Sequence, residues 1–255
     1  MDNDEIISKN KKHFNRQWTQ YDDLNFMKGQ TFKDHLLKCT NSKPEDWKDK
    51  VVFCGGEGIG RNVIGALELG VKKITVTELT ECGVNAIRKN TTALHTKIPF
   101  IYPADLCNLD KEKDDVYDIA FSINCIPHIP DYKQAISELV RITKPGGLIM
   151  FNMPPKRDPI IAKNDNAIRE LSTQFDEAGG IIFSKIIAYM GRTSEINDVL
   201  SKVMEVSTDE LSAYDHFLLP YTSEFTQEEI RTFIKDFNCR LLKINNLISV
   251  KARKL

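Results

Sequence analysis

Short apolar runs alternate with helix-periodic segments along the first 155 residues. The runs are rich in β-branched residues and end in glycine or polar residues, which is typical of buried strands. Strands are expected at KVVFCG (50–55), KKITVTEL (72–79), IPFIYPADL (98–106), YDIAFSIN (117–124) and, after a KPGG turn, GGLIMFNM (146–153). Helical patterns cover 13–40, 61–70, 82–94 and 131–143. This alternation predicts parallel βαβ units and a doubly wound α/β sheet.

The end of the chain departs from this alternation. The amphipathic segment 226–237 begins at a plausible helix cap, Thr226, with Glu229 at capping-box spacing. CRLLKI (239–244) and LISVKARK (247–254) follow as alternating strands, joined by Asn245 and Asn246, which suit a tight hairpin. We therefore expect a seven-stranded, mostly parallel sheet whose last strand is antiparallel.

Residues 156–222 form an insert between the fifth and sixth expected strands. Charged helical stretches (162–180 and 194–206) flank an apolar piece, IIFSKIIAYMG (181–191). The insert is too long for a simple crossover, and it is predicted to be a lid or a dimerisation element. The expected domains are a helical leader or cap (1–45), a core (46–155 and 223–255) and a helical substrate or lid insert (156–222).

Composition narrows the class of protein. The chain has 255 residues, with 35 Lys and Arg against 36 Asp and Glu, so no global basic field favours nucleic acid or an anionic membrane. Six scattered cysteines show neither a CxxC pair nor zinc-ligand spacing, which predicts reduced thiols and no metal site. A polar N-terminus and the lack of a ~20-residue apolar run predict a cytoplasmic protein that does not enter membranes.

The stretch VFCGGEGIGRN (52–62) is the most informative motif. Gly56, Gly58 and Gly60 lie between an expected strand and helix, where glycines let a ligand approach the main chain. Glu78 ends the next expected strand, at a position suited to accept both hydroxyls of a ribose. Dinucleotide sites need GxGxxG, but Arg61 or Val63 occupies the third glycine position. The lack of GK[ST] excludes a phosphate-binding P-loop.

The series VFCGGEGIGRN, TVTEL, ADL, SINCIPHIPD and KPGGLIMFNM resembles the class I S-adenosylmethionine (SAM)-dependent methyltransferases over about 50–155, plus the terminal hairpin. The resemblance implies SAM as cofactor and S-adenosylhomocysteine (SAH) as product. It places the three glycines beneath the methionine and ribose and Glu78 at the ribose hydroxyls. The adenine would meet Leu79, Asp105 and Leu106, and the methionine would lie near Asn124.

Two residues depart from the family pattern. Cys54 stands where the family usually has Asp or Glu, and Glu57 stands within the loop where a small residue is common. A carboxylate at the usual position orients the loop and meets the cofactor's ammonium group, which Cys54 cannot do. Glu57 either supplies the missing charge or points to solvent. If neither residue serves, weak cofactor binding or a non-catalytic relative is implied.

His128, just past the fourth expected strand, is the candidate general base. A base is needed only when the acceptor is a protonated oxygen or nitrogen. The resemblance also supports this histidine, which is frequent in this branch of the family. The alternative is a loop histidine that bonds its own turn. The absence of an NPPY-like tetrapeptide argues against the enzymes of this fold that methylate DNA amino groups or protein glutamine.

The remaining candidates would bind the acceptor. Trp18 and Tyr21 in the leader would fold over the cofactor, unless they pack as core. Basic groups in the insert would bind phosphate or carboxylate, unless they are solvated surface charges. The substrate candidates are Trp18, Tyr21, Lys156, Arg157, Tyr189, Arg192 and His216.

The sequence therefore predicts a SAM-dependent methyltransferase that acts on a small metabolite. The leader segment FNRQW resembles leaders of methyltransferases that act on bacterial surface glycans and their precursors, over few residues. This favours an oxygen acceptor on a sugar or phosphorylated glycan precursor. The alternatives are methylation of RNA or of a quinone-like ring, and a non-catalytic binding protein of the same fold. A homodimer is possible, and nucleic acid is not an expected partner.

Overall fold

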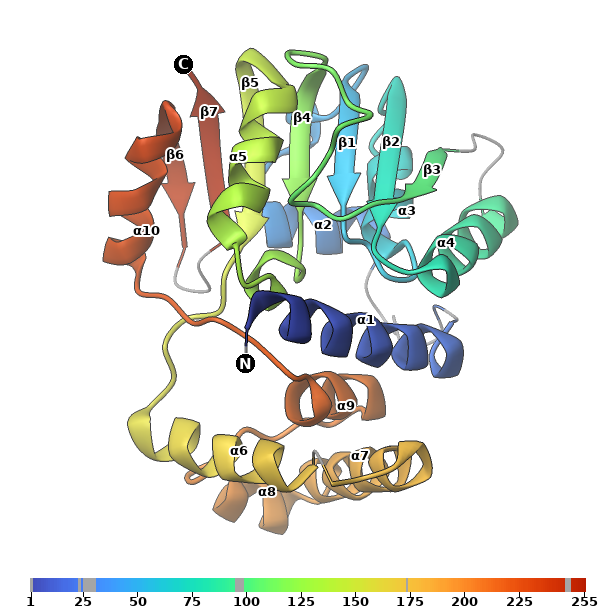
Figure 1. Cartoon of the computed structure of the whole chain (residues 1–255), viewed down its shortest axis with the longest axis vertical. Coiled ribbons are helices and arrows are strands. Elements are labelled where there is room, and N and C mark those ends of the chain that lie inside the picture. The colour runs from blue at the N-terminus through green and yellow to red at the C-terminus, as the bar shows by residue number, and fades with distance from the viewer. Residues whose placement is uncertain (1, 23, 25–30, 95–98, 173, 246–248) are drawn as a thin grey trace. The chain divides into compact units, whose positions relative to one another are not determined.

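A seven-stranded sheet forms the centre of the larger part of the chain (Figure 1). The computed structural model describes residues 2–22, 24, 31–94, 99–172, 174–245 and 249–255. Among these residues, the strand order is β3-β2-β1-β4-β5-β7-β6. The strands are β1 (Val51–Gly55), β2 (Lys73–Glu78), β3 (Phe100–Pro103), β4 (Tyr117–Ser122), β5 (Thr143–Asn152), β6 (Cys239–Ile244) and β7 (Ser249–Lys254).

The pairing confirms the predicted topology. Strands β1 to β5 pair in parallel, whereas β7 is antiparallel to both β5 and β6. The turn between β6 and β7 begins at Asn245, whose Oδ1 accepts the N–H of Ser249 at 2.9 Å. Asn246, the other residue predicted for this turn, lies outside the described residues.

Four of the helices that the structure describes in this part begin within one residue of the predicted places, whereas α2 (Phe32–Thr40) begins inside the segment 13–40 that was expected to be helical throughout. The four are α3 (Arg61–Glu68), α4 (Glu81–Leu94), α5 (Tyr132–Ile142) and α10 (Gln227–Phe233), with short 3₁₀ turns η1 (Pro44–Asp46), η2 (Ile126–His128) and η3 (Ile234–Phe237). Asp131 caps α5 by accepting the N–H of Gln134 at 3.1 Å. Thr226 and Glu229 form the predicted capping box of α10. These caps satisfy N–H groups that the first turn of a helix leaves unpaired.

Two strand boundaries differ from the sequence prediction. The fifth strand begins at Thr143, which pairs with Tyr117, rather than after the KPGG turn. Gly146 has φ 78°, and the parallel pairing resumes at Ile119 and Leu148 after a shift in register. Glycine tolerates this conformation and forms a bulge, so the strand continues where a turn was expected. The third strand covers only 100–103, and its expected end at 104–106 is a loop.

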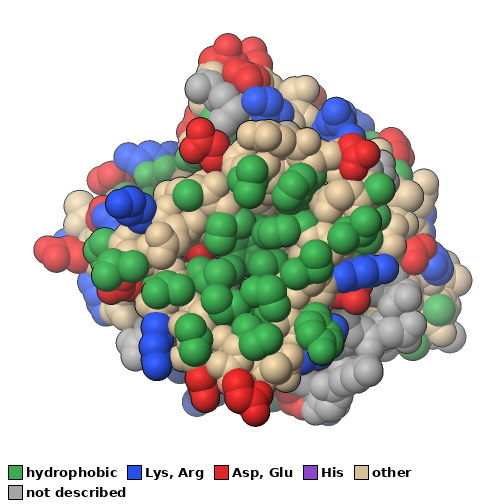
Figure 2. All heavy atoms as spheres, turned by 90° about the horizontal axis from the view of Figure 1, so that it is seen from below, with side chains coloured by type: hydrophobic (Ala, Val, Ile, Leu, Met, Phe, Trp, Pro, Cys, Tyr) green, Lys and Arg blue, Asp and Glu red, His purple; other side chains and the backbone are tan. Residues whose placement is uncertain are grey.

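The chain divides into two compact units, which we call the sheet unit (22–155 and 223–255) and the helical unit (1–21 and 156–222). The helical unit contains α1 (Asn3–Gln20), α6 (Pro159–Ser172), α7 (Glu177–Arg192), α8 (Ser194–Leu200) and α9 (Glu210–Leu218). The expected leader is divided, because α1 belongs to the helical unit and α2 to the sheet unit. Many apolar side chains are exposed on one side of the molecule (Figure 2).

The apolar piece 181–191 is part of a longer helix. Asp176 caps α7 by accepting the N–H of Gly179 at 2.7 Å, so Gly179 and Gly180 lie in its first turn instead of ending a helix. The core of the helical unit is a small cluster built around Ile187 and Phe217.

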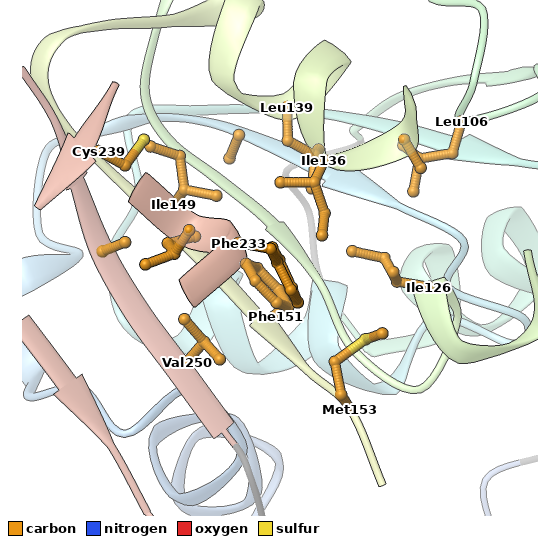
Figure 3. Close-up of a cluster of buried hydrophobic side chains, with 14 of the residues drawn as sticks. Leu106, Ile126, Ile136, Leu139, Ile149, Phe151, Met153, Phe233, Cys239 and Val250 are labelled. Atoms are coloured by element: carbon orange, nitrogen blue, oxygen red, sulfur yellow. The ribbon is translucent and has the colours of Figure 1, made fainter. Parts of the chain in front are cut away.

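Strand residues alternate between two apolar clusters, one on each face of the sheet. In β1, Phe53 joins the cluster that includes α5 and α10, whereas Val52 and Cys54 join the cluster that includes α2, α3 and α4. Figure 3 shows the first cluster, where Phe151 of β5 lies beside Phe233 of α10. Both faces are therefore covered, as parallel sheets require, and the carboxyl ends of the strands remain for a ligand.

Among the residues that the structure describes, no helix is both long enough and apolar enough to span a bilayer.

Candidate functional site

The glycine loop joins the end of β1 to the start of α3 in the sheet unit. Gly56, Gly58 and Gly60 have φ values of 70°, 57° and 91°, which residues with a Cβ rarely adopt. A Cβ on Gly56 would lie 2.1 Å from Sγ of Cys125, so only glycine fits there. Glycine is therefore required both by the backbone conformation of this loop and by its close approach to Cys125.

Glu78 connects the end of β2 to this loop. Its side chain is 4% exposed, and its Oε2 accepts the N–H of Gly58 at 3.0 Å. The N–H and hydroxyl of Thr80 approach Oε1 at 3.3 and 3.4 Å. Burial raises the pKa of Glu78, while these hydrogen bonds oppose the rise. A carboxylate has about four acceptor positions, and these three donors leave one of them, on Oε2, for a ligand hydroxyl.

Glu57 is a second buried carboxylate in the same loop. It is 6% exposed, which excludes the solvent-facing alternative. The Asn62 side-chain amide donates to Oε1 at 3.2 Å, and Oε2 has no hydrogen-bond partner among the described residues. Burial raises the pKa of Glu57 to about 7, against the opposing effects of Cys54 and Asn62. The loop thus holds an acid that gains from a cationic partner.

Cys54 is fully buried in the apolar cluster on the α2, α3 and α4 face of the sheet. Burial and the nearby Glu57 raise the pKa of its thiol well above the usual value, so it remains protonated. A carboxylate at position 54 would stand beside the carboxylate of Glu57. Only one of these two positions can therefore hold an ionised carboxylate, and in this chain it is position 57, in the loop.

The residues predicted to flank an adenine lie at the ends of β2 and β3. Leu79 is half-buried, and Leu106 is so close to the loop that a Cβ on Gly55 would lie 2.5 Å from its Cδ1. The N–H of Ala104 donates to the main-chain oxygen of Glu78 at 3.1 Å, which joins the two strand ends. Asp105 is half-buried and accepts the N–H of Cys107 at 2.9 Å.

The end of β4 is fixed by a pair of asparagines. Asn124 has φ 57°, and its N–H donates to Oδ1 of Asn152 at 2.6 Å. The Asn152 amide in turn donates to Oδ1 of Asn124. His128 follows in η2, half-buried, and its N–H donates to the oxygen of Cys125 at 2.9 Å. These contacts orient the connection that carries the candidate base.

Sequence reasoning missed four residues that shape the site. Asn62, Thr80, Cys125 and Asn152 hold or contact the residues that the sequence did identify. Asn62 and Thr80 follow their partners by five and two residues, so local spacing contains a signal for them. Cys125 and Asn152 meet theirs only through the pairing of β1, β4 and β5, which the linear pattern does not reveal.

In the helical unit, the structure brings Arg157 and His216 together around a residue that the sequence did not single out. Asp165 is fully buried, and its Oδ2 contacts Nη1 of Arg157 and lies 2.9 Å from Nε2 of His216. The N–H of Glu205 donates to its Oδ1 at 3.0 Å. Burial would raise the pKa of Asp165, but the His216 hydrogen bond and the other contacts lower it. This ion-paired cluster joins α6 to α9.

The other insert candidates lie apart from that cluster. Lys156 is exposed, and Tyr189 is exposed on α7 beside Ile182 and Ile186 in helical spacing. Arg192, at the end of α7, reaches the main-chain oxygen of Thr208 at 3.4 Å.

Helix α1 carries the leader candidates and a buried polar stripe. Asn10, His13 and Gln17 recur at helical spacing on its buried side. His13 stacks on Tyr214 of α9, with ring centroids 5.2 Å apart. Trp18 is half-buried and stacks on Phe14 at 6.3 Å. Tyr21 meets Tyr214 edge-on at 5.8 Å, and burial raises its pKa to about 12.

Residues 54–151 match the family model described as "Methyltransferase domain". The match begins at Cys54 and covers the glycine loop, Glu78, Asp105 and the end of β4 that the site comprises. This stretch, less than half of the chain, is similar to a methyltransferase domain. Beyond the matched residues, β7 runs antiparallel to β5, as the sequence predicted.

Solved structures share the fold of this stretch and its surroundings. A SAM-dependent methyltransferase from Aquifex aeolicus has 12% identity and a TM-score of 0.56, with 100% of each chain covered. The magnesium protoporphyrin IX methyltransferase of Synechocystis PCC 6803, with bound SAH, has 13% identity and a TM-score of 0.54, covering 89% of this chain and 82% of that one.

One similar structure has a different description. A Rhodobacter sphaeroides protein provisionally assigned to the zinc-dependent alcohol dehydrogenases has 15% identity and a TM-score of 0.54, covering 89% of this chain and 99% of that one. At these identities the likeness shows the fold alone. The cofactor class must therefore be argued from the loop, where Arg61 and Val63 do not fit a dinucleotide motif.

Proposed function

We propose that this protein transfers a methyl group from SAM to a small metabolite and releases SAH. The observation that carries the proposal is the buried carboxylate of Glu78, bonded at 3.0 Å to the N–H of Gly58. Burying a carboxylate is unfavourable unless it has partners. Its position at the end of β2, against a glycine-rich loop, suits it to bind the hydroxyls of a ribose.

The residues of the site fit SAM. Gly56, Gly58 and Gly60 would lie beneath the cofactor, and Glu78 would hold its ribose. The assigned adenine and methionine contacts are Leu79, Asp105, Leu106 and Asn124, with Cys54 beneath the loop. When bound, SAM supplies a methyl group on a cationic sulfur, which is already activated for transfer to a nucleophile. The chain's own residues then bind and orient the two reactants and exclude water. These effects are the main source of catalysis in such displacements.

Glu57 would take the role of the acid that Cys54 replaces. Oε2 has no hydrogen-bond partner among the described residues, and burial raises the pKa although the nearby charge of Arg61 opposes the rise. An ammonium group nearby would lower that pKa and stabilise the ionised form. We assign Glu57 to the ammonium group of the cofactor's methionine.

His128 would accept a proton from the acceptor. It follows the end of β4 in a connection that Asn124 and Asn152 fix. An imidazole is suited to this step because its ordinary pKa lies near neutral pH. A hydroxyl acceptor needs such a base, whereas a neutral amine does not.

The proposed acceptor is polar: an oxygen on a sugar or on a phosphorylated glycan precursor. The support is the leader segment FNRQW, which resembles leaders of methyltransferases that act on bacterial surface glycans and their precursors. We place the reaction in the cytoplasm, since none of the six cysteines, all of which the structure describes, forms a disulfide bond.

Tracing a labelled methyl group tests this function. The protein is incubated with methyl-labelled SAM and separate pools of polar metabolites, RNA and apolar ring compounds. Label is expected in the polar pool with the wild type and with Glu81→Gln, an exposed control, and at least about tenfold less with Glu78→Gln. Label in RNA or in the ring compounds overturns the acceptor class. Absence of label from all pools, with SAH still bound, supports the non-catalytic alternative.

A further inference from the structure

The outer side of helices α6, α7 and α8 is an apolar face that the methyltransferase reaction does not use. Figure 2 shows it as a continuous group of hydrophobic side chains with charged residues at its edge. We call it the α6–α8 face. We define it by the exposed large apolar residues between positions 159 and 203, which are Ile160, Leu171, Ile182, Ile186, Tyr189, Ile196, Val199 and Val203, each at least 37% exposed.

Helix α7 is apolar on two sides, which an isolated surface helix is not. Phe183, Ile187 and Met190 pack into the small core of the helical unit. Ile182, Ile186 and Tyr189 follow the same spacing one residue earlier and are 58%, 51% and 66% exposed. A helix that is hydrophobic around most of its circumference is normally buried on all those sides. The outer side of α7 therefore lacks a covering partner among the described residues.

The size of the face matches one half of a stable protein interface. If a fully exposed large apolar residue offers roughly 150–200 Å², the exposed fractions of the eight residues come to about 650–870 Å². The largest apolar patch on a typical monomer is ~300–600 Å². One partner in a standard-size complex buries ~800 Å².

Charge argues against a bilayer as the occupant. Residues 156–222 contain 7 Lys and Arg and 11 Asp and Glu, a net charge of 7 − 11 = −4. Helices that bind anionic membrane surfaces carry an excess of Lys and Arg beside the apolar side. The helical segment has the opposite balance, so an anionic lipid surface would repel it.

The charges at the two ends of α7 suit a second copy of the same helix. Asp176 is exposed at its amino end, and Arg192 is exposed at its carboxyl end. A two-fold axis that lies in the plane of the face and perpendicular to α7 sets the two copies of α7 antiparallel, so that Asp176 of each lies toward Arg192 of the other. This arrangement also opposes the two helix dipoles favourably. Both the charges and the apolar area are then self-complementary.

We propose that the α6–α8 face is the interface of a homodimer with two-fold symmetry. The insert serves in this role as the dimerisation element. The proposal is independent of the methyl acceptor and of cofactor binding.

Analytical ultracentrifugation of the full chain tests the interface, at about 1 to 100 µM, the range that reveals micromolar association. The wild type is expected to be a dimer in the upper part of this range. Ile186→Glu and, separately, Val199→Glu are expected to be monomers throughout, because each buries an unpaired charge in the interface. Leu94→Glu in α4, 52% exposed against 51% for Ile186, is the matched control and should remain a dimer.

Further measurements separate the possible occupants. At a concentration low enough for the wild type to be monomeric, circular dichroism and thermal melting should be alike for all variants, since every changed position is exposed in the monomer. Arg192→Glu should raise the dimer dissociation constant several-fold at low salt and less at high salt. A monomeric wild type at every concentration overturns the proposal, as does equal behaviour of Ile186→Glu and Leu94→Glu. Flotation of the wild type with phosphatidylserine vesicles, lost in Ile186→Glu, would assign the face to a membrane and overturn it too.

Discussion

At the scale of single residues, the site is defined by where one negative charge is placed. Cys54 occupies the position where related loops have an acid, while Glu57 introduces a carboxylate three residues later. The structure buries both side chains in the same region, with Glu57 bonded to Asn62. The loop therefore keeps the acid but gives it an unfavourable environment. A buried acid without a counter-ion has a raised pKa, and this has consequences for both stability and binding.

Glu57→Gln should change how stability depends on pH. The pKa of Glu57 rises from 4.5 to about 7 on folding, so the folded state binds more protons than the unfolded state between these values. The free energy of unfolding then falls as pH increases through this window. The free energy of unfolding of the variant, taken relative to that of the wild type, should increase by on the order of 2–3 kcal/mol from pH 4.5 to pH 8. Urea denaturation across this range measures the difference, and a pH-independent difference would contradict it.

Restoring an acid at position 54 should improve neither the stability of the protein nor its binding of SAH. Cys54→Asp puts a second carboxylate beside Glu57 in a fully buried position, where two like charges disfavour ionisation. We expect a loss of about 2 kcal/mol or more in stability and no tighter binding of SAH. The double variant Cys54→Asp with Glu57→Gln, which holds a single acid, should recover most of the stability and most of the SAH affinity of the wild type. Tighter SAH binding by the single variant, measured by calorimetry, would show that Glu57 does not replace the missing acid.

At the scale of elements, the helical unit depends on a buried ion cluster that ties α6 to α9. Asp165→Asn leaves Arg157 and His216 without their shared acceptor at a fully buried position. We expect the helical unit to lose about 3–5 kcal/mol of stability. Hydrogen exchange should show this loss as faster amide exchange across residues 156–222. Asp198→Asn, an exposed change on α8, is the control and should have almost no effect. Unchanged exchange in the Asp165 variant would mean that the cluster is not what joins the helices.

The sequence predicted most elements because their signals are local. The apolar runs identify the strands, and Asp131, Thr226 and Glu229 identify helix starts by spacing alone. The start of β5 was missed because Gly146 bends the strand without ending it. The cluster of Arg157, Asp165 and His216 was missed for another reason. Its members are up to 59 residues apart, and only the packing of α6 on α9 brings them together.

At the scale of the whole molecule, chemistry and association belong to different units. The cofactor candidates, from Cys54 to Asn124, lie in the sheet unit, and the α6–α8 face lies in the helical unit. The glycine loop and Glu78 were identifiable from sequence because a strand end and a turn are local features. The apolar outer side of α7 was visible only as an apolar segment. Periodicity cannot tell which side of a helix faces the core when both sides are apolar.

The central claim is that the loop and Glu78 together bind the adenosine of SAM, and calorimetry with SAH tests it most directly. We predict saturable binding by the wild type and by the exposed control Glu81→Gln. Glu78→Gln keeps the shape of the side chain but loses its charge, and it should bind about 10 to 100-fold more weakly. Equal affinity for wild type and Glu78→Gln, or binding of a nicotinamide dinucleotide in place of SAH, would contradict the account.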